Sequence, residues 1–226
     1  MARKDDILSI YTREVEGIKE AGLFKGEAPF VSPQGARVKM EDGRELLCMC
    51  ANNYLGLGDN PRLIEAAKRT YDEKGYGVAS VRFICGTQDI HKKLEKKISG
   101  FLRTDDTILY SSCFDANGGL FETILTAEDA VISDELNHAS IVDGCRISKA
   151  ETAVYRHSDM ADLERLLQTV PCEGQRFIVT DGVFSMDGDI CPLPALAALK
   201  KDYRACLIVD DAHASGVIGR TGRGTA

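Results

Sequence analysis

Near its start, the chain places apolar residues at two different spacings. Over residues 4–21 they recur three or four positions apart, which lines one face of an α-helix, and Gly22 supplies an end for that helix. The apolar positions are Ile7, Ile10, Tyr11, Val15 and Ile18. Residues 37–40 and 45–50 then have strand-like composition, and Asp42-Gly43 between them is a strong turn signal. The pattern predicts a helix followed by a β-hairpin.

Two further helices are predicted from their start signals. Asn60 precedes Pro61, and a helix typically begins with such a cap residue followed by proline in its first turn. A third helix is expected to be capped by Thr87 and to reach Phe101.

Beyond residue 101, short strand-like runs alternate with helical stretches. The predicted strands are residues 107–110, 130–133, 152–155, 177–180 and 205–209. The predicted helices between them are residues 120–125, 138–148, 160–167 and 194–200. Strands that alternate with helices at this period form βαβ units. The chain is therefore predicted to be an α/β protein with a mainly parallel sheet covered by helices.

Charge and cysteine content narrow the class of protein. The chain has 226 residues and a net charge of −7, which argues against a general binder of nucleic acid or of anionic membranes. Its eight cysteines show no C-x-x-C or zinc spacing, so no metal site is expected. The thiols are scattered, the start of the sequence does not look like a signal peptide, and no apolar run reaches bilayer length. Together these features predict a cytoplasmic protein.

A carboxylate ends the last strand-like run. Asp210 follows residues 205–209, and His213 comes three residues later. In α/β proteins, functional groups lie at the carboxyl ends of parallel strands. A carboxylate there is costly without a positive or proton-donating partner, and the protonated ring nitrogen of pyridoxal phosphate (PLP) is one such partner. The alternative is that Asp210 only caps the helix that follows.

Three other strand ends carry polar groups. Residues 111–119 lead into a helix whose free backbone N–H groups could bind a phosphate, although an ordinary turn has the same composition. His138 begins the next helix, where its flat ring could stack on a flat cofactor or simply cap the helix. Ser185 lies in a glycine-flanked loop and could bond the phenolic oxygen of a pyridoxal ring or be structural. The four strand ends together favour a PLP site.

Several long runs resemble the α-oxoamine synthases, a family of PLP-dependent fold type I enzymes. The matching runs are residues 50–57, 80–88, 111–122, 137–141, 180–188 and 209–213. The resemblance covers essentially the whole chain. It implies an aspartate aminotransferase-like fold and pyridoxal 5'-phosphate as cofactor.

The resemblance also implies roles for single residues. Backbone amides of Cys113 and Phe114 would hold the PLP phosphate. His138 would stack on the ring and contact the substrate, and Ser185 with His213 would bond the ring hydroxyl oxygen. Asp210 would keep the ring nitrogen protonated. His138, Asp210 and His213 are thus the expected catalytic residues, and Asn52 is similar to the asparagine that meets the amino-acid carboxylate.

The implied reaction is condensation of glycine with acetyl-CoA to 2-amino-3-oxobutyrate and CoA, or the reverse cleavage in threonine breakdown. The alternatives are a family member with another amino acid or acyl-CoA, or a non-catalytic subunit or fragment. The family's Schiff-base lysine follows the Asp-x-x-His strand, and the sequence ends at Ala226 without that segment. The sequence is therefore expected to be truncated before the lysine segment and the C-terminal small domain, and inactive alone.

Two expectations concern organisation. Residues 1–45 are expected to form an N-terminal helix and hairpin arm, and residues 46–226 an incomplete PLP-binding large domain. Fold type I sites are generally shared across a homodimer, so the resemblance implies a dimer for the full-length protein. Arg82 and Thr87 are the candidates near the partner's site.

Overall fold

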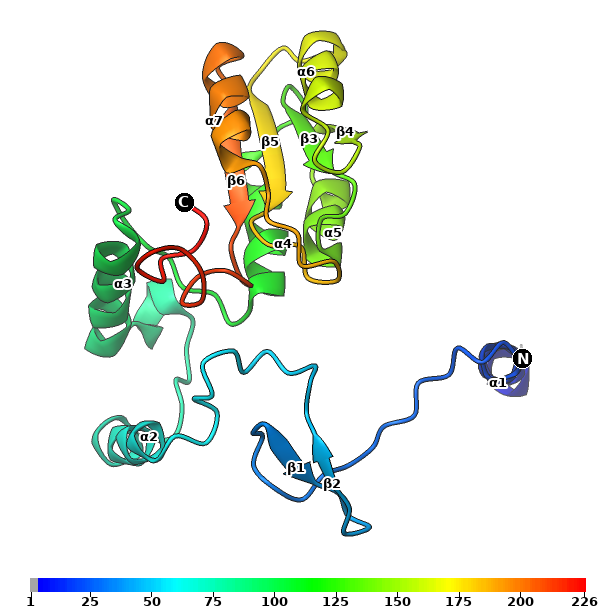
Figure 1. Ribbon diagram of the computed structural model, residues 1–226, viewed down its shortest axis with the longest axis vertical. Coiled ribbons are helices and arrows are strands. Elements are labelled where there is room, and N and C mark those ends of the chain that lie inside the picture. Colours follow the sequence, from blue (N-terminus) through cyan, green and yellow to red (C-terminus); the bar gives the residue numbers. More distant parts are fainter. Residues whose placement is uncertain (1–3) are drawn as a thin grey trace. The chain divides into compact units, whose positions relative to one another are not determined.

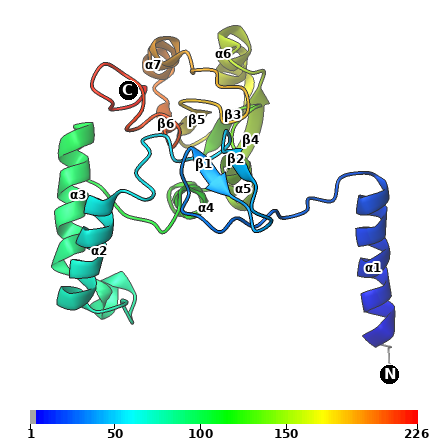
Figure 2. The same cartoon turned by 60° about the horizontal axis from the view of Figure 1, so that its bottom comes forward.

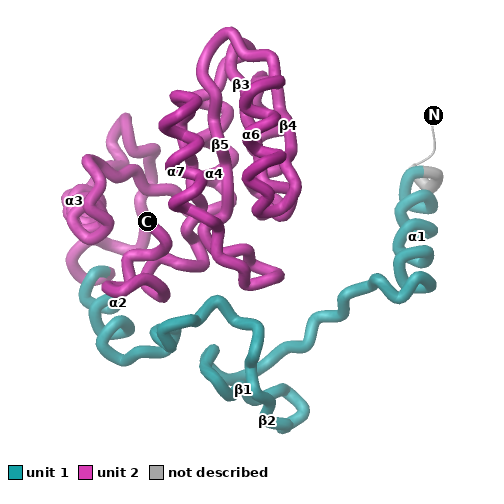
Figure 3. The backbone as a smooth tube through the Cα atoms, turned by 45° about the horizontal axis from the view of Figure 1, so that its top comes forward, with its two compact units in different colours: residues 1–70 teal, residues 71–226 magenta. Residues whose placement is uncertain are grey.

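A computed structural model describes residues 4–226 and divides the chain into two compact units, residues 1–70 and residues 71–226 (Figure 3). The predicted domains, with a boundary between residues 45 and 46, stay a prediction about the complete protein.

The first unit holds the predicted helix and hairpin. Helix α1 spans Lys4–Glu20 and is followed by Gly22 at a positive φ of 70°. Strands β1 (Arg37–Lys39) and β2 (Glu45–Leu47) pair antiparallel, with Val38 opposite Leu46. The tight turn between them needs a left-handed residue, which Gly43 supplies with φ of 86°. Both elements are confirmed, although β2 ends before Cys48.

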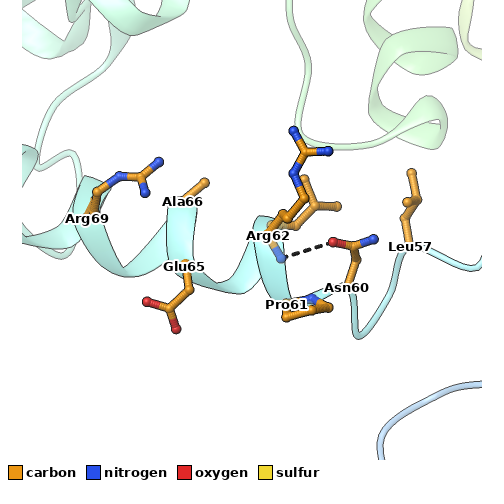
Figure 4. Close-up of a pocket in the computed structure, with 8 residues that line it drawn as sticks. Leu57, Asn60, Pro61, Arg62, Glu65, Ala66 and Arg69 are labelled. Carbon is orange, nitrogen blue, oxygen red and sulfur yellow. Dashed lines mark hydrogen bonds between the residues drawn. The ribbon is translucent and has the colours of Figure 1, made fainter.

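The second predicted helix is confirmed together with its cap. Helix α2 spans Pro61–Lys74. The backbone N–H of Arg62 donates to Oδ1 of Asn60 at 3.0 Å, as Figure 4 shows. This bond satisfies one of the amides that the first turn of a helix leaves free.

The third helix was predicted with the wrong cap. Helix α3 spans Asp89–Leu102, and its N-cap is Gln88, whose backbone N–H donates to Nδ1 of His91 at 3.0 Å. Thr87 does not cap α3, since its hydroxyl instead bonds Arg82: it donates to the carbonyl at 2.6 Å and accepts from Nε at 3.4 Å. That bond lies across the short π-helix η1, Arg82–Gly86.

The second unit is built on a four-stranded parallel sheet with the order β4-β3-β5-β6 (Figure 1). The strands are β3 (Ala130–Asp134), β4 (Glu151–Tyr155), β5 (Arg176–Asp181) and β6 (Cys206–Asp210). The helices are α4 (Cys113–Ile124), α5 (Ala139–Ile147), α6 (Met160–Thr169) and α7 (Leu193–Asp202). The predicted βαβ alternation is confirmed from residue 113 onward.

The prediction of a strand at residues 107–110 is wrong for this structure. A strand needs a neighbour that completes its ladder of backbone hydrogen bonds, and within residues 4–226 no other segment pairs with this run. Ile108, in the middle of the run, has 73% of its surface exposed. The β-forming composition is present, but the pairing partner is not.

Helices cover both faces of the sheet. Alternate residues of β3 point to opposite faces, so Ile132 packs with Leu163 of α6 and Leu196 of α7. Val131 packs with Phe121 of α4 and Ile141 of α5 on the other face. Figure 2 shows the two helix pairs on either side of the strands. Burial on both faces explains why β3 is apolar at successive positions.

Helices α4 and α5 approach so closely that Gly144 has no room for a side chain. A Cβ atom there would lie 2.5 Å from Cδ2 of Phe121 and 2.9 Å from the carbonyl oxygen of Asn117. We expect Gly144→Ala to lower the free energy of unfolding of the complete protein by about 1–3 kcal/mol, because overpacking outweighs the better helix propensity of alanine. Urea denaturation would measure this change.

Gly100→Ala, inside α3, is the matched control. Nothing lies within 4 Å of a Cβ atom at Gly100. We expect that variant to be neutral or more stable by up to about 1 kcal/mol. Equal stability changes in the two variants would contradict the close helix contact.

Candidate functional site at the carboxyl edge of the sheet

Three of the four parallel strands end on a carboxylate at the same edge of the sheet. Asp134, Asp181 and Asp210 are the last residues of β3, β5 and β6. Asp181 and Asp210 are directly opposite each other in the β5–β6 register. Because ligands of open α/β sheets bind outside the carboxyl ends of the strands, this edge is the candidate site.

The first turn of α4 offers unsatisfied amides. Ser112 is the N-cap, and its side chain accepts from the backbone N–H of Asp115 at 3.0 Å. Within the described residues, the backbone N–H groups of Cys113 and Phe114 donate to no carbonyl or side-chain oxygen. Burial, together with the charge of Asp210, raises the pKa of the Cys113 thiol. The helix start therefore lies near Asp210 and can bind an anion through two free amides.

One buried amide connects the two residues expected to contact the cofactor ring. Asn117 of α4 donates from Nδ2 to Oδ2 of Asp210 at 2.8 Å and to Oγ of Ser140 at 2.9 Å. Oγ of Ser140 in turn lies 2.7 Å from Nδ1 of His138. The second oxygen of Asp210 accepts the backbone N–H of Ala212 at 3.0 Å. Asp210 therefore also caps the turn that follows β6, whereas the alternative interpretation expected a helix there, and the described residues after Asp210 form none.

His138 is the N-cap of α5, and this role assigns the tautomer of its neutral ring. Nδ1 accepts the backbone N–H of Ser140 at 3.2 Å. A backbone N–H can only donate, so the hydrogen-bond network assigns the proton of a neutral His138 to Nε2. The ring of Phe114 meets the His138 ring edge-on at 6.4 Å between centroids. The capping alternative is correct for Nδ1 and leaves the exposed ring free for a further contact.

Asp181 is a second carboxylate beside Asp210. It is 2% exposed, and its Oδ2 accepts the backbone N–H of His138 at 2.8 Å. Burial raises the pKa of Asp181 to about 6; the bond from His138 opposes this rise and the charge of Asp210 adds to it. At neutral pH, the site therefore gathers substantial negative charge, which suits a cationic group.

The structure places the remaining candidates less tightly. His213 follows β6 and is close enough to Asp181 to influence its pKa. Ser185 is exposed in the loop after β5, at the same edge of the sheet. Asn52 belongs to the first unit, where its Oδ1 accepts the hydroxyl of Tyr54 at 3.1 Å. The structure thus brings five of the predicted residues together at this edge of the sheet: Cys113, Phe114, His138, Asp210 and His213.

Sequence reasoning missed Asn117, Ser140 and Asp181. A signal for Asn117 was present, because it shares the buried face of α4 with Phe121, four residues later. A polar residue on an apolar helix face needs a buried partner. Neither the spacing nor the residue types showed that the partners would be Asp210 and Ser140.

The described part of the chain contains neither a metal cluster nor a membrane span. Within residues 4–226, no group of three or more His, Cys, Asp or Glu side chains is arranged to hold a metal ion. No helix in that part of the chain combines the length and apolar character needed to cross a membrane.

Solved structures with a similar fold cover nearly the whole chain. Serine palmitoyltransferase from S. paucimobilis with a bound PLP–myriocin aldimine has a TM-score of 0.88 at 30% identity and covers 99% of this chain and 58% of that one. Serine palmitoyltransferase from Sphingomonas wittichii has a TM-score of 0.89 at 32% identity, covering 99% and 56%. The predicted PLP fold type I is confirmed for this chain.

Curated relatives are similar at higher identity. The 2-amino-3-ketobutyrate coenzyme A ligase of Salmonella typhimurium is 53% identical over 98% of this chain and 56% of its own length. The mitochondrial protein of that name from Bos taurus is 54% identical over 96% and 52%. The 8-amino-7-oxononanoate synthase 1 of Bacillus velezensis is 50% identical over 94% and 54%. The chain spans a little over half the length of these relatives.

A family model gives the assignment that these similarities support. The model described as aminotransferase class I and II matches residues 44–225. The match includes every strand and helix of the parallel sheet and all the candidate residues at its carboxyl edge. This chain therefore belongs to the class I and II aminotransferase family.

Proposed function

We propose that the complete protein is a PLP-dependent glycine C-acetyltransferase, which condenses glycine with acetyl-CoA to 2-amino-3-oxobutyrate and CoA and catalyses the reverse cleavage. The names of relatives at 53% and 54% identity support this reaction. PLP is supported by a solved structure of the same fold, serine palmitoyltransferase with a bound PLP–myriocin aldimine. The observation that carries the proposal is the convergence of two free amides, an imidazole and an aspartate at one edge of the sheet.

The residues present fit the cofactor. The free amides of Cys113 and Phe114 would hold the phosphate at the positive end of α4. Asp210 would face the ring nitrogen, and the His138 ring would stack on the cofactor. Ser185 and His213 would bond the ring hydroxyl oxygen. Bound PLP would take up the electrons that remain when glycine loses its α-proton.

The chain's own groups would do three things. The Asp210 carboxylate, oriented by Asn117 and by the amide of Ala212, would hold a proton on the ring nitrogen. His138 would present its Nε2–H at the exposed end of the ring, where it can donate to a substrate oxygen. Asn52 would bind the amino-acid carboxylate.

Assembly and location are part of the proposal. A homodimer is proposed for the complete protein, with Arg82 and Thr87 near the partner's site. In this structure, Arg82 donates to the buried carboxylate of Glu95 at 2.6 Å and lies 3.4 Å from the Thr87 hydroxyl. A cytoplasmic location also stays a prediction, since the names of several relatives place those proteins in mitochondria.

The experiment uses the complete protein. Purified protein should show the absorbance of bound PLP and should release CoA from acetyl-CoA only when glycine is present. Longer acyl-CoA esters, tested in parallel, separate this reaction from that of a relative such as the 8-amino-7-oxononanoate synthase. Release of CoA that is faster with a longer ester, or no release with any ester, would contradict the proposal.

A further inference from the structure

His157 lies between two carboxylates from different elements and has no part in the proposed reaction. Its Nδ1 is 2.9 Å from Oδ1 of Asp134, and its Nε2 is 3.3 Å from Oδ2 of Asp189. The ring of Phe184 meets the His157 ring edge-on, with 4.4 Å between centroids. The His157 side chain is only 18% exposed. Each ring nitrogen therefore faces an acidic partner, and Nε2 also lies 3.5 Å from Oγ of Ser158.

The Asp134 side of this bridge is fixed. Its carboxylate is 1% exposed and ends the central strand β3. Besides His157, it accepts the backbone N–H groups of Leu136 and Ser158, both at 2.9 Å. These bonds and its burial hold the carboxylate at the end of β3, so it acts as an anchor on the sheet.

The Asp189 side belongs to a loop. Residues 182–190 follow β5 and carry Ser185. The loop is closed by the backbone bond from Phe184 to the carbonyl of Asp189 at 2.9 Å and by that from Gly188 to the carbonyl of Phe184 at 2.8 Å. The Asp189 carboxylate is 62% exposed. Its ion pair with His157 is therefore a side-chain link between this loop and β3 that can be broken without unfolding the core.

Protonation decides how many of these bonds His157 can donate. An imidazolium donates from both nitrogens, whereas a neutral ring donates from one only. Burial lowers the pKa of His157, but its bonds to Asp134 and Asp189 outweigh this, so the pKa is raised overall. The linked state is thus fully present below the unfolded pKa and is lost as pH rises through the raised value.

Other charged groups near His157 are engaged elsewhere. On β4, burial raises the pKa of the Tyr155 phenol far above its usual value, so this group stays neutral. Burial also raises the pKa of the Cys191 thiol, which follows the loop. Arg156 pairs with Asp159 and Asp162 at the start of α6. Asp134 and Asp189 therefore set the charge around the ring.

We propose that His157 is a positioning residue whose protonated ring ties the loop of residues 182–190 to β3 and thereby holds Ser185 in place. Loss of the proton releases the Asp189 side of the link. The consequence for Ser185 rests on the proposed function, because that function gives Ser185 its bond to the cofactor. The tie itself depends only on the contacts of His157.

The test uses the complete apoprotein and the variants Asp189→Asn and His157→Gln. Hydrogen–deuterium exchange at the histidine C2 position, read by mass spectrometry, gives the pKa of His157. Backbone exchange gives protection factors for residues 182–190. In the wild type, we expect loop protection to fall roughly two- to fivefold as pH rises through that pKa, the range for a partly exposed ion pair. Both variants should show the lower protection at every pH.

Asp187→Asn is the matched control, since Asp187 is an exposed carboxylate in the same loop and contacts neither nitrogen of His157 among the described residues. It should leave the pKa of His157 and the loop protection unchanged. Asp189→Asn should lower the pKa of His157. Equal loop protection at low and high pH in the wild type, or unchanged protection in Asp189→Asn, would overturn the proposal.

Measuring the PLP affinity of the holoenzyme separates the link between His157 and Asp189 from its effect on Ser185. If Ser185 depends on the tie, Asp189→Asn should weaken PLP binding in the wild-type background but not in Ser185→Ala. Equal weakening in both backgrounds would overturn the positioning role. A protein that binds no PLP but shows the expected loop protection would refute the proposed function while supporting the tie.

Discussion

Asp210→Asn in the complete protein should reduce turnover by about 10²–10³-fold while PLP stays bound, the cost typical of removing one preorganised electrostatic group. An amide cannot keep the ring nitrogen protonated, whereas the amides of Cys113 and Phe114 that would hold the phosphate are untouched. The oxygen of the new amide can still accept the backbone N–H of Ala212, and Asn117 would have to turn its amide so that its oxygen accepts from the new NH2 group, so the backbone of the site should keep its shape. The measurements are glycine-dependent CoA release and the absorbance of bound PLP.

Asp202→Asn serves as the control for this prediction. Asp202 is an exposed carboxylate at the end of α7 and has no place in the site. Its replacement should leave turnover and PLP binding at wild-type values. If Asp210→Asn bound PLP and turned over at near the wild-type rate, Asp210 would not have the assigned role.

The parallel sheet could be predicted because its strands carry their own signal. Residues 130–134 and 176–181 are buried on both faces, so apolar residues follow one another without the alternation of a half-exposed strand. Asp210 was recognised as a carboxylate at the end of an apolar run. Asp134 and Asp181 carry the same signal at the ends of β3 and β5 and were not singled out. Composition alone was sufficient to predict a strand wherever the apolar residues of the run are buried in the structure.

The pairing of strands and the contact partners of side chains could not be predicted in the same way. Residues 107–110 have strand composition, but a strand also needs a neighbour, which one short window does not show. The helical periodicity of α1 was recognised, yet its apolar side chains such as Ile7 and Tyr11 are exposed in this structure, and periodicity does not say what covers them. Thr87 and Gln88 are both plausible caps, and the contact of Thr87 with Arg82 decided between them.

The hydrogen-bond partners of Asn117 likewise could not be predicted from sequence. Substitution of this residue is expected to have a large effect on stability. This buried amide donates one hydrogen to Asp210 and the other to Ser140, on elements far apart in the sequence. Asn117→Leu keeps a similar volume but removes both donors. We expect it to lower the free energy of unfolding by about 1–3 kcal/mol, because two polar partners are left unsatisfied.

Asn117→Asp should cost more at neutral pH, and its cost should depend on pH. The new carboxyl group would sit where Nδ2 now lies 2.8 Å from Oδ2 of Asp210, and two carboxylates this close cannot both ionise freely. Its pKa in the folded protein would therefore be raised above the unfolded value of about 3.9. The sign follows from linkage: stability is retained below the unfolded pKa and is lost as pH rises through the raised folded value.

Urea denaturation of the complete apoprotein across the acid to neutral range would measure both variants. The stability of Asn117→Asp should fall with rising pH relative to Asn117→Leu, and the two should converge or reverse in acid, where a protonated carboxyl can still donate one hydrogen bond. Parallel stability profiles for the two variants would contradict the contact with Asp210. Loss of activity in Asn117→Leu with PLP still bound would further show that this amide orients the Asp210 carboxylate, since the substitution leaves Asp210, His138 and the amides of α4 chemically intact.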